Sequence, residues 1–295
     1  MHQSRETRAF LLLTLVTMVW AGLMPTGKII LQGLPPLTIA AIRMTVGTLL
    51  LSFYLRRESR PIPWSPKLVV AFLLLGFIGF VFSTGGSYYG LRLTTATNAA
   101  LLNASSPVTL ALLSVLILKE RLPRRSVLGI ILSVIGVGVI ITRGSWQVIA
   151  QSQYNRGDLI LLCTQTSWGL YTIYGRRLME SVSPLAATTF AYMAGGLWLI
   201  LGSCLFEQGQ WRFAEVSWPS WIALVYQCIL GSFAHFWFYD AVSVLGPSRA
   251  GVFLNLVPVM AIVISSTLLD EPLLPSHFIG GAIVISGILV ATRRS

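Results

Sequence analysis

Charged residues are scarce in this sequence, and their scarcity excludes a water-soluble fold. Only 11% of the 295 residues are Asp, Glu, Lys or Arg, whereas a soluble domain carries roughly 25%. Hydrophobic residues make up 55%, and they recur in runs of about 20 residues, the length that a helix needs to cross a bilayer. The composition therefore predicts an all-α membrane protein with the bilayer as its solvent.

Residues that build catalytic and metal sites are also few. Cys163, Cys204 and Cys228 lie within apolar runs without metal-ligand spacing, so we expect them to fill space. The three histidines are scattered, and Asp270 with Glu271 is the sole adjacent acidic pair. No HExxH pattern, phosphate-binding glycine loop or ATP-binding motif occurs. We therefore expect no enzyme, no cofactor and no metal site.

The net charge of +11 does not indicate a nucleic-acid partner, because the cations lie in short segments between apolar runs. Proline, glycine and charged residues delimit ten such runs. The first lacks a small-residue cleavage site and is expected to be a retained span. The predicted spans are residues 9–31, 35–55, 67–89, 95–118, 125–143, 157–178, 184–206, 218–243, 248–269 and 275–292.

The distribution of the cations predicts the orientation of these spans. With a cytoplasmic N-terminus, fifteen of the 21 Lys and Arg residues fall in or beside cytoplasmic segments and five on the outside, while Arg43 falls within a span. Positive charge is retained preferentially in the cytoplasm. The sequence therefore predicts a multi-pass protein of the inner (cytoplasmic) membrane with both termini in the cytoplasm.

The second half of the sequence repeats the first. A shift of 151 residues pairs Pro107 with Pro258, and a shift of 148 residues pairs Trp20 with Trp168. Gene duplication explains these matches better than chance.

We interpret residues 1–150 and 151–295 as two repeats of five helices each. Because five is odd, the second repeat must cross the membrane in the opposite sense. The charges agree with this inversion, since the connector after the fourth span is basic whereas residues 270–272, after the ninth, include no cation. The predicted architecture is ten helices in two inverted repeats.

Several of these features together resemble one family. They are the tryptophan in the first helix, the arginine in the second, the Pro-Val pairs of the fourth and ninth, and the glutamate that ends each of those two. The whole chain resembles the drug/metabolite transporter superfamily, and most closely its EamA-type branch. The resemblance implies that helices one, three, four, six, eight and nine surround a central cavity, and that the protein is a secondary transporter, as many members export amino acids or other metabolites.

Polar and aromatic side chains that share a helix face are candidates for the wall of such a cavity. Helices one and six carry equivalent tryptophans, which either line the cavity or fill contacts between helices. Aromatic walls favour an apolar, aromatic or cationic small-molecule substrate. The candidate substrate-binding residues are Thr17, Trp20, Met24, Lys28, Thr84, Tyr88, Asn103, Ser106, Gln165, Trp168, Tyr171, His235, Tyr239 and Asn255.

Two ionisable residues within the predicted spans have open roles. A group that can carry charge at membrane depth is costly and is a functional candidate by default. His235 suits either proton coupling or a neutral hydrogen bond to a neighbouring helix. Arg43 suits either a structural anchor or a substrate clamp.

Pro107 and Pro258 lie near the middle of the fourth and ninth spans, and each removes a helical hydrogen-bond donor. We expect them to be pivots about which helices three and four rock against eight and nine. Alternatively, the neighbouring Ser and Asn side chains only repair the kinks. Gly136 and Gly280 belong to small surfaces in helices five and ten that suit either internal packing or a homodimer.

The expected function is export of a small metabolite, an amino acid or a related compound, by alternating access. A channel or a membrane-embedded receptor for a small molecule is the alternative, since both can be built around a cavity without a catalytic motif. The expected partners are the substrate and membrane lipid.

Overall fold

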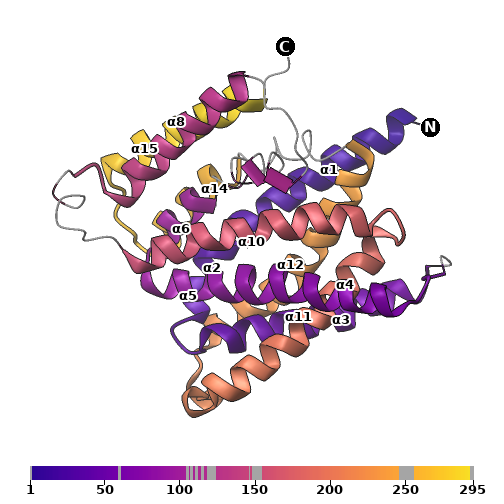
Figure 1. Ribbon diagram of the computed structural model, residues 1–295. Helices are drawn as coiled ribbons and strands as arrows, with labels where there is room; N and C mark the ends of the chain where they lie inside the picture. The colour runs from indigo at the N-terminus through magenta and orange to yellow at the C-terminus, as the bar shows by residue number, and fades with distance from the viewer. Residues whose placement is uncertain are drawn as a thin grey trace.

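A computed structural model describes most of the chain. It covers residues 2–58, 61–103, 106, 109, 112–113, 116–117, 124–145, 147, 155–245 and 256–292. Within these ranges the regular structure is helical and contains no β-strand (Figure 1).

The described helices overlap the predicted spans, of which the fourth and the ninth are described only in part. The first span is divided at Gly22 into two helices, and the third runs from α-helix through a π-helical segment, η1, back to α-helix. Two short 3₁₀ turns, η2 and η3, follow α11. The elements are α1 His2–Ala21, α2 Leu23–Ile30, α3 Pro36–Leu55, α4 Pro66–Gly76, η1 Phe77–Gly85, α5 Gly86–Leu93, α6 Ala96–Asn103, α8 Arg124–Ile141, α10 Arg156–Leu178, α11 Pro184–Phe206, η2 Gln208–Gln210, η3 Phe213–Glu215, α12 Trp218–Leu245, α14 Leu256–Leu268 and α15 Pro275–Thr292.

The helix starts follow from local sequence. Pro36, Pro66 and Pro184 each occupy the first helical position, where the missing N–H costs no hydrogen bond. The side chains of Ser65 and Ser183 accept hydrogen bonds from the backbone N–H three residues later, which caps α4 and α11. Proline and serine in the connectors therefore set where these two helices begin.

Five stretches of the described chain are long and apolar enough to cross a membrane. They are Glu6–Ile30, Pro36–Leu55, Pro66–Leu93, Pro184–Phe206 and Trp218–Ala241. Many large apolar side chains on the outside are exposed, such as Leu49 at 68% and Leu205 at 62%. Such a surface is unfavourable in water and favourable in a hydrocarbon solvent. The chain is an all-α membrane protein.

Helices from the two halves of the chain pack against each other throughout. α3 lies along α11, α1 and α2 lie against α12, and α10 lies against η1 and α5. α6 contacts α14, and α8 pairs with α15 at one end of the bundle (Figure 1). The centre of the molecule is therefore bordered by both halves of the sequence.

Glycine permits the closest of these approaches. A Cβ atom at Gly76 would lie 2.5 Å from the backbone nitrogen of Gly195, and one at Gly136 would lie 2.7 Å from the carbonyl oxygen of Gly280. The first pair joins α4 to α11, and the second joins α8 to α15. Gly136 and Gly280 thus serve packing within one chain, while a homodimer through these helices stays a prediction.

The proposed pivots are only partly within the described residues. Pro107 lies outside them, as does the candidate Asn255. Pro258 belongs to α14, but its side chain is not among those described. Their role as pivots stays a prediction.

Candidate substrate cavity

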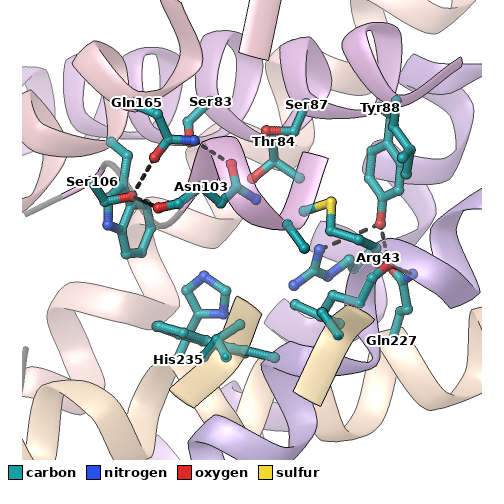
Figure 2. Close-up of a pocket in the computed structure, with 18 residues that line it drawn as sticks. Arg43, Ser83, Thr84, Ser87, Tyr88, Asn103, Ser106, Gln165, Gln227 and His235 are labelled. Carbon is teal, nitrogen blue, oxygen red and sulfur yellow. Dashed lines mark hydrogen bonds between the residues drawn. The ribbon is translucent and has the colours of Figure 1, made fainter. Parts of the chain in front are cut away.

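A cavity of about 170 Å³ lies in the middle of the bundle, between helices of both halves (Figure 2). Nine described elements contribute to its wall, from α1 to α14. Its lining combines apolar, aromatic, hydroxyl and amide side chains with one guanidinium group. The lining residues are Trp20, Leu23, Met24, Arg43, Ser83, Thr84, Ser87, Tyr88, Leu91, Ala100, Asn103, Ser106, Gln165, Trp168, Gln227, His235, Val257 and Ala261.

One wall is aromatic. The indole rings of Trp20 and Trp168 meet edge to face, with centroids 6.1 Å apart. The imidazole of His235 contacts both, at 5.2 Å from Trp20 and 5.6 Å from Trp168. Nδ1 of His235 lies 2.9 Å from the carbonyl oxygen of Gly231, which can only accept, so Nδ1 carries a proton. In the neutral ring, Nε2 is then a hydrogen-bond acceptor.

A second wall joins α6 to α10 through amide groups. The side-chain amide nitrogen of Gln165 donates to Oδ1 of Asn103, and the hydroxyl of Ser106 donates to Oε1 of Gln165 (Figure 2). The Ser106 hydroxyl also lies 2.5 Å from the backbone oxygen of Asn103. These bonds hold the polar groups of two helices together at the cavity surface.

Arg43 reaches the cavity from the side of Tyr88 and Gln227 (Figure 2). Its Nη1 donates to the hydroxyl of Tyr88 over 3.3 Å, and that hydroxyl donates to Oε1 of Gln227. The amide nitrogen of Gln227 in turn donates to Leu23 O and Thr26 Oγ1, both at 2.9 Å. This chain of hydrogen bonds fixes the direction of the guanidinium.

The π-helical segment η1 supplies two hydroxyls, those of Ser83 and Thr84. A π-turn widens the helix and often occurs at functional sites. Its glycine at position 79 lies against the ring of Tyr171, because a Cβ atom there would collide with that ring. The segment is therefore held against α10 while its hydroxyls reach the cavity.

Nine of the fourteen predicted residues line this cavity. They are Trp20, Met24, Thr84, Tyr88, Asn103, Ser106, Gln165, Trp168 and His235.

Four other candidates are not among the residues that line this cavity. Thr17 is buried, and its hydroxyl donates to Leu13 O over 2.8 Å. Tyr171 and Tyr239 pack against each other behind the cavity with ring centroids 5.8 Å apart. Lys28, one helical turn beyond Met24, donates hydrogen bonds to backbone carbonyl groups. The predicted helix faces were broader than the strip of each helix that borders the cavity.

Lys28 instead belongs to a cluster of polar contacts around residues 91–98, where α5 ends and α6 begins. We call this cluster the polar seal. Its Nζ donates to Leu91 O over 2.8 Å and also to Thr94 O. The Thr94 hydroxyl donates to Asp158 over 2.5 Å. The carboxylate of Glu271 accepts from the N–H groups of residues 96 and 97, at 2.7 and 2.9 Å, and so caps α6. Segments from four parts of the chain thus converge where α5 ends and α6 begins.

The sequence prediction missed Ser83 and Gln227 and left the role of Arg43 open. Gln227 interrupts an otherwise apolar run in α12, and this single polar residue was an available signal. Arg43 has no counterpart in the repeat, so symmetry could not place it. Apolar lining residues such as Leu23 and Ala261 carry no signal in the sequence that separates them from lipid-facing ones.

Comparison with known proteins identifies the family. The model of the EamA-like transporter family matches residues 7–142 and again residues 155–293. The chain is 32% identical over 227 residues to the uncharacterized transporter YyaM of Bacillus subtilis, covering 77% of this chain and 74% of the relative. It is 26% identical over 299 residues to a probable terminal-alkyne amino-acid exporter of Streptantibioticus cattleyicolor, covering 97% and 93% of the two chains.

A solved crystal structure has the same fold, with a TM-score of 0.66, 19% identity and 96% of each chain covered. With the family model matching nearly the full length, and with a central cavity enclosed by apolar helices, the chain belongs to the EamA-like transporter family.

Proposed function

We propose that this protein is a secondary transporter that exports a small metabolite, an amino acid or a related compound, by alternating access across the cytoplasmic membrane. The observation that carries the proposal is the cavity between the two halves of the chain, lined by hydroxyl, amide and aromatic groups. Small-molecule sites combine apolar walls with a few oriented polar groups in this way. The amino-acid exporter among the relatives supports the substrate class and the direction.

The pattern of helix contacts supports two inverted repeats. In the two repeats α1 corresponds to α10, α3 to α11, and the helix that contains η1 to α12. The contact of α1 with α12 then has its counterpart in that of α10 with η1, and the contact of α3 with α12 in that of α11 with η1. Two halves with one pattern of packing can exchange conformations and so open the same site to either side. Ten spans, with both termini in the cytoplasm, are part of the proposal.

The polar seal supports the proposal that the carrier has a gate on the side of the membrane where Lys28 lies. In the proposed orientation this is the outer side. Its hydrogen bonds link residues 91–98 to α2, α10 and the segment after α14. A carrier must close one side while the other is open. Polar contacts between helix ends can break at moderate cost because water replaces them.

Counterflow in proteoliposomes tests the proposal. Vesicles loaded with an unlabelled amino acid should accumulate the labelled form transiently, with saturation and competition, because a carrier exchanges one solute per conformational cycle. The assay covers each standard L-amino acid, with protein-free vesicles as the control. Flux that rises linearly with concentration would instead indicate a channel, and binding without flux would indicate a receptor. Cells lacking the protein should retain the exported solute.

A further inference from the structure

Arg43 is a buried cation without a counterion among the described residues. Its side chain is 5% exposed, it lies within a membrane-spanning helix, and no Asp or Glu of the described chain forms an ion pair with it. Within the described residues it donates one hydrogen bond, to the neutral hydroxyl of Tyr88, and its Nε has no partner there. Burying an unpaired charge is strongly unfavourable. A purely structural arginine would be expected to have a carboxylate beside it.

A second donor among the cavity-lining residues, in the aromatic wall, is also without a partner within the described part of the chain. The indole Nε1 of Trp20 is buried and makes no hydrogen bond to any described residue. An indole nitrogen can only donate, and a guanidinium can only donate. Trp20 and Arg43 both line the cavity, and the unpaired charge of Arg43 calls for a negative group there.

The fold makes room for the guanidinium in the cavity wall. Gly231 of α12 faces it, and a Cβ atom at this glycine would lie 3.1 Å from Nη2 and 3.3 Å from Nε of Arg43. Tyr88 and Gln227 hold the group from behind through their hydrogen bonds. A guanidinium fixed in this way can bind a carboxylate through two parallel N–H groups.

We infer that the transported solute carries a carboxylate and that Arg43 is its counterion in the cavity. This inference rests on the proposed transport function and narrows its substrate class. The aromatic wall of Trp20, Trp168 and His235 then receives the remainder of the solute, and the hydroxyls of Ser83 and Thr84 are available to its other polar groups. A solute whose only charge is positive is disfavoured by Arg43.

The first test compares matched ligands on the full chain purified in detergent, with the rise in the thermal unfolding midpoint as readout. The probes are the standard L-amino acids, followed by the carboxamide and the decarboxylated amine of each one that binds. We expect the amides and amines to bind at least about tenfold more weakly, since they leave Arg43 unpaired. Equal binding of the analogues that lack the carboxylate, or no binding by any amino acid, would overturn the inference.

The second test substitutes Arg43. Arg43→Met should reduce amino-acid binding to the level of the amides, while the unfolding midpoint of the ligand-free protein stays the same or rises, because an unpaired buried charge is removed. Arg43→Lys keeps the charge but loses the planar fork, so it should retain part of the affinity. Arg212→Gln, at an exposed ion pair with Glu215 and not among the cavity-lining residues, is the matched control and should behave as wild type.

A structural anchor at position 43 gives the opposite pattern. The midpoint would then fall in Arg43→Met, and the folded variant would keep its preference for carboxylates, which would overturn the inference. Counterflow separates this result from failure of the transport function itself. Saturable exchange of amines or neutral solutes, with no preference for carboxylates, contradicts the carboxylate inference alone. Absence of saturable exchange for every solute contradicts transport.

Discussion

Trp20 and Trp168 lie 148 residues apart in the chain, and their indole rings meet edge to face in the cavity wall at a centroid distance of 6.1 Å. They occupy equivalent positions in the two halves of the sequence, and His235 contacts both rings. The pair therefore joins the first helix of one half to the first helix of the other at the proposed binding site.

We expect Trp168→Ala to weaken solute binding by about tenfold while the protein still folds. An aromatic contact contributes about 0.5–1.5 kcal/mol beyond its buried area, and 1.4 kcal/mol corresponds to tenfold in affinity. Titration of the amino acid that binds most tightly measures the loss. Trp218→Ala is the control, because that side chain is 74% exposed and lies at the start of α12. Equal losses in both variants would argue against a binding role for Trp168.

Removing the carboxylate of Glu271 should open the polar seal. In Glu271→Ala, the N–H groups of residues 96 and 97 lose their acceptor, and loss of a helix cap costs about 1 kcal/mol. We expect faster labelling of a cysteine introduced by Ala100→Cys, which is 1% exposed and lines the cavity. The reagent is membrane-impermeant and is added from the side that holds Lys28.

The labelling experiment requires a background in which Cys163, Cys204 and Cys228 have been replaced. Glu215→Ala serves as the matched control, since this glutamate forms only an exposed ion pair with Arg212. Unchanged labelling in Glu271→Ala would contradict the role of the seal as a gate.

Gly79 and Gly138 should respond oppositely to the same substitution. A Cβ atom at Gly79 collides with the ring of Tyr171, so Gly79→Ala should destabilise the protein by about 1–3 kcal/mol, the usual cost of overpacking. A Cβ atom at Gly138 meets nothing within 4 Å, and alanine favours the helix, so Gly138→Ala should be neutral or slightly stabilising. Thermal unfolding in detergent measures both. A stable Gly79→Ala variant would show that η1 and α10 can separate easily.

Reporter fusions test the orientation. A reporter that is active only outside the cytoplasm should be silent after Ser295 and active when inserted at Gln210, because the excess of cations places both termini inside. Gln210 lies in the exposed turn η2, and exposed turns generally tolerate insertions. The reverse pattern would contradict the orientation and would move the polar seal to the cytoplasmic side.

The helices and their positions could be read from the sequence. Apolar runs of spanning length leave the backbone no alternative to a helix in lipid, and Pro36, Pro66 and Pro184 mark where helices begin. The internal repeat of the sequence already pairs Trp20 with Trp168, because duplicated segments retain equivalent positions. The sequence also indicates Gln165 and Asn103 as cavity residues, because amide side chains are unfavourable against lipid.

Only the tertiary structure decided which of these residues share the cavity. Lys28 lies on the same predicted helix face as Trp20, yet its long side chain bonds to the carbonyl groups of Leu91 and Thr94, where α5 ends. Arg43 was ambiguous, because a cation in an apolar helix can snorkel, pair or face a cavity, and the choice depends on what the neighbouring helices present to it. Here Gly231, Tyr88 and Gln227 from two other helices make the space and hold the group. The sequence by itself determined the helices, because each depends on local hydrophobicity, whereas the cavity depends on the relative rotation of helices distant in the chain.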